Sequence, residues 1–209
     1  MSQIKPPRRG SRQACSSQTG ALVVEFALLA TLFFTVLFGV IELARVVYLF
    51  NTLQEVTRRV AHDASGTSFK DSAALTQVRK DALVLNTDGV LIFGDPVTAD
   101  HIRIDYMALQ RASDGTLTLS PIPSNQLPNY PSCNNFNCIH DQNSTSGTSS
   151  CIRFVRVRVC DPTSANGCNP VNYQPLTQFF PTLGLKLPAS TTIVKAGTLG
   201  YIPGQPICN

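Results

Sequence analysis

The sequence predicts an α+β protein: a long N-terminal membrane-spanning helix that continues into a small disulfide-bonded extracytoplasmic domain with a short helix and an antiparallel sheet. Three observations support this fold class. One apolar run lies near the N-terminus, several short segments alternate apolar with polar residues, and six of the seven cysteines fall in the C-terminal half. With 209 residues, of which 14% are charged, the chain is long enough for one moderate domain beyond that helix.

The apolar run extends from residue 21 to residue 41 and contains one charged side chain, Glu25. A helix of this length reaches ~31 Å, which is enough to cross the ~30 Å hydrocarbon core of a bilayer. The basic residues before the run are Lys5, Arg8, Arg9 and Arg12, and the next one is Arg45. By the positive-inside rule, this asymmetry predicts a cytoplasmic N-terminus, with the chain after about residue 45 on the outer side of the membrane.

The start of the apolar run has its own pattern: Gly20, then four apolar residues beginning with Ala21, then Glu25. A secretory signal peptide has a shorter apolar run followed by a small-residue cleavage site, which does not fit this chain. A cut between Gly20 and Ala21 would instead leave the helix on the mature protein, and the pattern resembles the processing site of type IV prepilins. Because a carboxylate inside a membrane costs about 3 kcal/mol, we expect Glu25 to pair with the α-ammonium of Ala21 on a neighbouring subunit.

The segment from residue 20 to residue 66, GALVVEFALLATLFFTVLFGVIELARVVYLFNTLQEVTRRVAHDASG, resembles the TadE-like family, pilin-related proteins of the Tad (Flp-type) pilus system. The resemblance rests on Gly20, the run from Glu25 to Leu28, the run from Phe38 to Glu42, Arg45 and Tyr48. It implies a minor pilin or pseudopilin that packs laterally through its helix after cleavage. The implied partners are other pilin-like subunits, the prepilin peptidase, the Tad inner-membrane assembly platform and membrane lipid.

Two alternatives stay open at this point. The chain could be a permanently anchored envelope scaffold that keeps residues 1–20, or an adhesin-like protein that binds through the Pro-, Ser- and Asn-rich loop at 120–150. We expect no enzyme, no catalytic residue and no cofactor, since the sequence lacks a phosphate loop and a nucleophile motif. Nor do we expect a nucleic-acid partner, because no stretch interleaves aromatic with basic residues.

Past residue 41 the helical pattern continues, with apolar residues at three- and four-residue spacing up to about Ala64, before Gly66. Glu42 and Arg45 are three residues apart, so they either pair on one helical face or only mark the membrane interface. A second, shorter helix is predicted from residue 71 to about residue 85, with Asp71 or Ser72 as its cap.

Four later segments have a period of two: residues 101–109, 153–159, 191–201 and, marginally, 115–119. They predict a small antiparallel sheet packed on the outer part of the long helix. The expected organisation is a basic cytoplasmic leader at 1–20, a transmembrane and pilin-like helix at 21–64, and an α+β domain at 65–209. Within that domain, residues 120–150 are expected to form an irregular tethered loop.

The candidates for disulfide bonds are Cys133, Cys138, Cys151, Cys160, Cys168 and Cys208, while Cys15 lies in the leader. In an oxidising periplasm we expect three bonds, for which 15 pairings exist. Proximity in the sequence favours Cys133 with Cys138 and Cys160 with Cys168, which leaves Cys151 for Cys208. A metal site is not expected, because the chain has no C-x-x-C motif and His140 is the one histidine near the cysteines.

Overall fold

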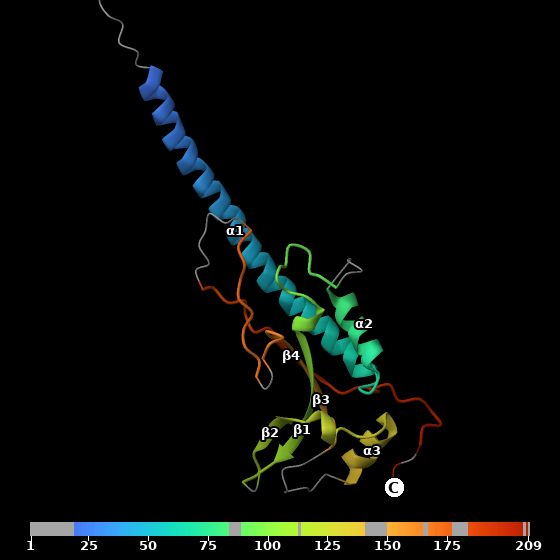
Figure 1. Cartoon of the computed structure of the whole chain (residues 1–209). Helices are drawn as coiled ribbons and strands as arrows, with labels where there is room; N and C mark the ends of the chain where they lie inside the picture. Colours follow the sequence, from blue (N-terminus) through green and yellow to red (C-terminus); the bar gives the residue numbers. More distant parts are fainter. Residues whose placement is uncertain are drawn as a thin grey trace, which may run out of the picture. The chain divides into compact units, whose positions relative to one another are not determined.

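The computed structural model describes residues 19–83, 89–112, 114–140, 150–164, 167–176, 184–206 and 208 (Figure 1). The basic segment, with Lys5, Arg8, Arg9, Arg12 and Cys15, lies outside these residues. The chain forms two compact units, Met1–Ile41 and Glu42–Asn209, which we call the N-terminal and the C-terminal unit. The predicted α+β class is confirmed: a long apolar helix is followed by short helices and a four-stranded antiparallel sheet.

Helix α1 spans Thr19–Gly66, starting and ending two residues beyond the predicted limits of 21 and 64. In the N-terminal unit its large apolar side chains are exposed all around the helix, as at Leu22, Phe26 and Phe33. The hydroxyls of Thr31 and Thr35 donate to the carbonyls one turn earlier at 2.8 and 2.7 Å, so their polarity is satisfied within the helix. By length and composition, this helix is capable of crossing a membrane.

In the C-terminal unit, α1 has an apolar face and a charged face. Leu49, Leu53, Val56 and Val60 are buried, because the three- and four-residue spacing puts them on one side. The opposite side carries exposed charged residues such as Arg59. Each fully buried leucine contributes about 2 kcal/mol, so this face binds the helix firmly to the rest of the unit.

Helix α2 spans Ser72–Ala82 and begins where the sequence predicts. The Asp71 carboxylate caps it by accepting a hydrogen bond from the N–H of Ala74 at 2.9 Å. Leu75 and Ala82 are its buried residues, so the helix packs through one narrow side. The helix is shorter than predicted and ends at Ala82 rather than near residue 85.

The sheet contains β1 (Ile102–Arg111), β2 (Leu117–Pro121), β3 (Phe154–Val159) and β4 (Thr191–Lys195), in the order β2-β1-β3-β4. All neighbours are antiparallel, and β1 pairs with β3 in the register Ile104 to Val157. One face of the sheet packs on α1. The hydroxyls of Thr57 on α1 and Thr192 on β4 lie 3.0 Å apart, and the core joins Val155 and Val157 to the buried face of the helix.

Strand β4 ends at Lys195, earlier than the predicted strand end at residue 201. The reason is a change of hydrogen-bond partner: the N–H groups of Gly197 and Leu199 both donate to the carbonyl of Ser65, at 3.1 and 3.0 Å. A Cβ at Gly197 would lie 2.9 Å from that same oxygen, so glycine permits this close approach of the chain to α1. The segment after β4 is thus attached to the helix instead of the sheet.

The prediction of an irregular loop over 120–150 was wrong in part, because Pro131–His140 forms helix α3. Pro131 is the first residue of this helix, a position where its missing N–H costs nothing. Asn134 is buried and exchanges two hydrogen bonds with the backbone of Ile152, at 3.1 and 2.7 Å, which attaches α3 to the segment just before β3. Residues 141–149, the rest of that predicted loop, lie outside the described part of the chain.

Candidate functional site

The predicted processing and registration residues lie in the first two turns of α1. Gly20, Ala21 and Glu25 are all exposed, and nothing lies within 4 Å of the position that a Cβ on Gly20 would occupy. The fold therefore does not itself require glycine at this position. Glu25 has no ion-pair partner among the described residues, so its carboxylate is available to a group on another molecule.

A second set of polar contacts surrounds Arg45, one turn into the C-terminal unit. Its side chain is 5% exposed and lies 3.6 Å from Glu42 Oε1. Three of its N–H groups donate to backbone carbonyls: Nε to Phe93 at 2.8 Å, Nη1 to Gln174 at 2.6 Å and Nη2 to Asp95 at 3.0 Å. These acceptors come from two loops far apart in the sequence, so one guanidinium joins α1 to both.

Tyr173 completes this Glu42–Arg45 cluster. Its hydroxyl donates a short hydrogen bond to Glu42 Oε1, and its ring lies 5.3 Å from Arg45 Cζ. The N–H of Leu176 donates to the same carboxylate oxygen at 3.3 Å. Burial and the hydrogen bond to Glu42 raise the pKa of Tyr173 to about 12, so the phenol stays protonated and keeps donating at neutral pH.

The geometry of the cluster is that of a connector rather than a catalytic centre. A buried cation is tolerated only when it is paired and hydrogen-bonded, and the planar guanidinium meets this requirement with Glu42 and three carbonyls. From the sequence, Glu42 and Arg45 either paired on one helical face or only marked the membrane interface; the structure shows the pair, together with two loops that the sequence did not indicate. An arginine within an otherwise apolar helical stretch was the available signal that buried acceptors would be needed.

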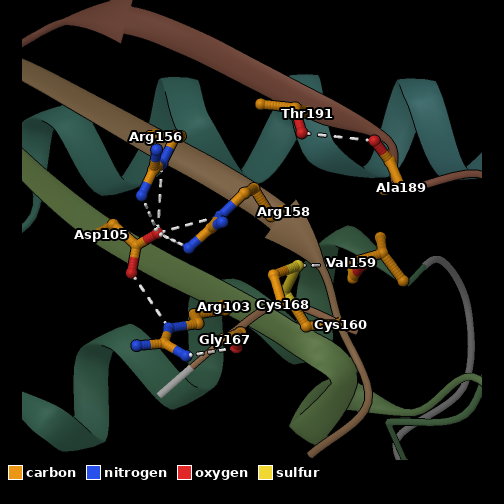
Figure 2. Close-up of polar contacts among 10 residues, drawn as sticks. All are labelled: Arg103, Asp105, Arg156, Arg158, Val159, Cys160, Gly167, Cys168, Ala189 and Thr191. Atoms are coloured by element: carbon orange, nitrogen blue, oxygen red, sulfur yellow. Dashed lines mark hydrogen bonds and ion pairs between the residues drawn. A yellow bond between two sulfur atoms is a disulfide. The ribbon is translucent and has the colours of Figure 1, made fainter. Parts of the chain in front are cut away.

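The other face of the sheet carries a second charged cluster (Figure 2). Asp105 on β1 accepts from Arg103 Nε at 3.0 Å through one oxygen, and from Arg156 Nη2 at 3.0 Å and Arg158 Nη2 at 2.6 Å through the other. Burial disfavours the charged carboxylate, but the hydrogen bonds from Arg158 and Arg156 outweigh it and hold the pKa of Asp105 below its usual value. The cluster stabilises the pairing of β1 with β3.

All six predicted cysteines form disulfides, but with pairings that differ in part from those expected. Cys160 pairs with Cys168 as proximity indicated, and Figure 2 shows this bond at the end of β3. The other two expected pairs were wrong. The structure joins Cys133 to Cys208 and Cys138 to Cys151, with Cα–Cα distances of 5.2 and 4.8 Å.

Helix α3 explains the correction. Cys133 and Cys138 both lie on it, five residues apart, so their side chains point in directions about 140° apart around the helix axis. Two cysteines so arranged cannot meet the geometry of a disulfide. Among the described residues, no group of three or more His, Cys, Asp or Glu side chains is placed to hold a metal ion.

A family model described as TadE-like protein matches residues 20–62. The match confirms the family resemblance for the segment that holds Gly20, Glu25, Glu42 and Arg45. It ends four residues before the last residue of α1, so the sheet and the disulfides lie outside it. No curated protein and no solved structure matches the chain.

Proposed function

We propose that this chain, whose residues 20–62 match the TadE-like family, is a minor pilin or pseudopilin of a Tad (Flp-type) pilus. The family match carries the proposal, because TadE-like proteins are structural and assembly proteins of such pili and not enzymes. In this role the protein is cut after Gly20 by a prepilin peptidase. It then packs against other pilin-like subunits through α1, with the Tad inner-membrane platform as its assembly partner.

The exposed apolar surface of α1 supports lateral packing. Within the N-terminal unit, the described residues from 20 to 41 leave large apolar side chains uncovered on every side of the helix. Such a helix is stable in lipid or in a bundle of similar helices, but not in water. The same surface therefore serves both as a membrane anchor before assembly and as a packing surface after it.

Glu25 supplies the proposed register between subunits. Cleavage after Gly20 frees the amine of Ala21, which points along the axis of its own helix and away from its own Glu25. A neighbouring copy, displaced along a filament, brings its ammonium to this carboxylate. Removing one member of such a buried pair costs about 3 to 5 kcal/mol, which is enough to select one register among several.

The test compares Glu25→Gln with Gly20→Val and with a matched control, Thr35→Val, which removes a polar group from the same helix without touching the charge. We expect Glu25→Gln to insert and to have the mature mass that begins at Ala21. Its incorporation into sheared filaments should fall by more than about 100-fold, which is the binding equivalent of 3 kcal/mol. Gly20→Val should keep residues 1–20, and Thr35→Val should match the wild type.

Incorporation of Glu25→Gln at the wild-type level would contradict the registration role. If the wild-type protein purified from the cell envelope has an intact mass that still includes residues 1–20, the permanently anchored scaffold is favoured instead. The two results are separate, because mass reports processing and filament content reports packing.

A further inference from the structure

Two loops of the C-terminal unit each carry a large apolar side chain that the unit leaves uncovered. Phe93 is 69% exposed and Leu176 is 53% exposed. Both adjoin the Glu42–Arg45 cluster, since Arg45 Nε donates to the carbonyl of Phe93 at 2.8 Å and the N–H of Leu176 donates to Glu42 at 3.3 Å. The cluster therefore holds both residues, which we call the apolar tips, beside the same turn of α1.

The backbone of Phe93 adds a second observation. Its φ is +53°, a left-handed conformation that bulky residues rarely adopt. The turn around it is closed by hydrogen bonds from Gly94 to the carbonyl of Leu91 at 2.9 Å and from Val97 to the carbonyl of Gly94 at 2.8 Å. Asparagine or glycine would suit this turn with less strain. Neither burial nor backbone preference accounts for a phenylalanine here, so its ring needs another explanation.

The position of the Glu42–Arg45 cluster along α1 suggests why Phe93 is exposed. The apolar run ends at Ile41, and Glu42 and Arg45 follow it directly. If residues 21–41 span the hydrocarbon core, then at ~1.5 Å per residue the cluster lies within ~6 Å of the end of that core, in a headgroup layer that is ~5 to 8 Å thick. Leu43 and Val47 on this stretch of α1 are exposed as well. The tips are thus attached to the helix at the depth of the membrane interface.

We propose that Phe93 and Leu176 insert into the interfacial layer of the bilayer that α1 crosses, and that a lipid surface is the partner of this end of the unit. Apolar side chains at this depth are removed from water by headgroups and upper acyl chains. The charges behind them do not face lipid, because Glu42 and Arg45 pair within the protein. The proposal requires only that α1 anchors the chain in a membrane, so it stands apart from the pilus role.

The chain has no tryptophan, so a single introduced tryptophan reports its own surroundings. The test places the full-length variants Phe93→Trp and Leu176→Trp in phosphatidylcholine vesicles at a low protein-to-lipid ratio. The matched control is Ile139→Trp, because Ile139 is 68% exposed but lies on α3. Quenching by lipids brominated near the headgroup measures lipid contact, and quenching by acrylamide measures contact with water.

We expect lipid quenching at both tips to exceed that of the control by about threefold, with weaker acrylamide quenching and a blue-shifted emission. Equal responses at the tips and at Ile139 would overturn the proposal. Protection from acrylamide without quenching by brominated lipid would also overturn it, because that result would mean that protein covers the tips. Because Leu176 lies on a different loop, its variant still tests the proposal if the tryptophan at position 93 disturbs the turn there.

Discussion

At the residue scale, the side chain of Arg45 joins helix α1 to two loops of the C-terminal unit. Its guanidinium reaches three carbonyls on two loops and pairs with Glu42, and its planar shape lets the N–H groups point outward in fixed directions. A lysine would keep the charge but has three donors on a single atom. A lysine at position 45 therefore cannot make the same set of hydrogen bonds, although it carries the same charge.

We predict that Arg45→Lys lowers the free energy of unfolding by about 2 kcal/mol, because carbonyls in a buried site lose their donors. The control is Arg59→Lys, since Arg59 is exposed and pairs with Glu55 at 2.7 Å. Exposed pairs are worth less than about 1 kcal/mol, so the control should change little. Urea unfolding of the detergent-solubilised chain, followed by circular dichroism, measures both, and equal changes would count against a connector role for Arg45.

Tyr173 predicts a specific loss of stability at high pH. Its pKa is raised from 10.0 to about 12, so the unfolded state releases the phenolic proton first as the pH rises. The stability that the folded tyrosine contributes is complete below pH 10 and is lost between pH 10 and about 12. Tyr106 has a pKa raised to about 12 as well, by burial, so it contributes to the same window.

The measurement compares the pH dependence of urea unfolding in the wild type with that of Tyr173→Phe. The variant should lose stability less steeply between pH 10 and 12, with the remaining slope coming from Tyr106. Tyr201→Phe serves as the control, because Tyr201 is more exposed. If Tyr173→Phe and Tyr201→Phe have the same slope, burial and the hydrogen bond to Glu42 do not raise the pKa of Tyr173 in the folded chain.

At the scale of elements, the strands were predictable and the third helix was not. Alternating valines and arginines in β3 define a strand from the sequence alone, because only one face of the sheet is buried. Helix α3 has ten residues that include a proline, three asparagines and two cysteines, so it offers no apolar stripe to recognise. That omission also led to the wrong cysteine pairs, since proximity in the sequence decides a pairing only when the segment between is not helical.

The full Glu42–Arg45 cluster could not be predicted from the sequence either. The sequence places Glu42 and Arg45 on one helical face, but their other partners lie far along the chain. Phe93 is 48 residues from Arg45, and Tyr173 is 128 residues from it. Only the packing of both loops against α1 brings these groups together, and no short-range pattern encodes it.

The disulfides lead to a prediction about elements. The Cys133–Cys208 bond closes 75 residues and the Cys138–Cys151 bond closes 13. In the chain-entropy picture, the longer closure contributes about 4.5 kcal/mol and the shorter about 3 kcal/mol. Replacing both cysteines of a pair by serine should therefore destabilise the chain more for the first pair than for the second. Peptide mapping without reduction should recover the two bonds, and a Cys133–Cys138 peptide would refute the pairing.

At the scale of the whole molecule, the two units depend on different surroundings. The C-terminal unit has its own core, built from α1, the sheet and the loops between them. The N-terminal unit buries no large apolar side chain among its described residues, so lipid or other helices must cover it. The sequence predicted an apolar run that ends at residue 41, but it placed the boundary between the helix and the α+β domain after residue 64. The order of the strands in the sheet and the contacts of the loops with α1 became known only from the structure.

The placement of the three disulfides has a mechanical consequence. All six bonded cysteines lie between residues 133 and 208, and none lies on α1, α2 or the segment leading into β1. If tension is applied to α1, no disulfide joins this helix to the rest of the unit, so the load passes through the backbone and through noncovalent contacts: the helix core, the Ser65 carbonyl and the Glu42–Arg45 cluster. Under tension no disulfide limits the extension of the described segments before Cys133, while the three bonds keep the loops between Cys133 and Cys208 closed. We therefore expect local unfolding under force to begin at the contacts of α1, while the disulfide-bonded segments after residue 133 stay linked to one another.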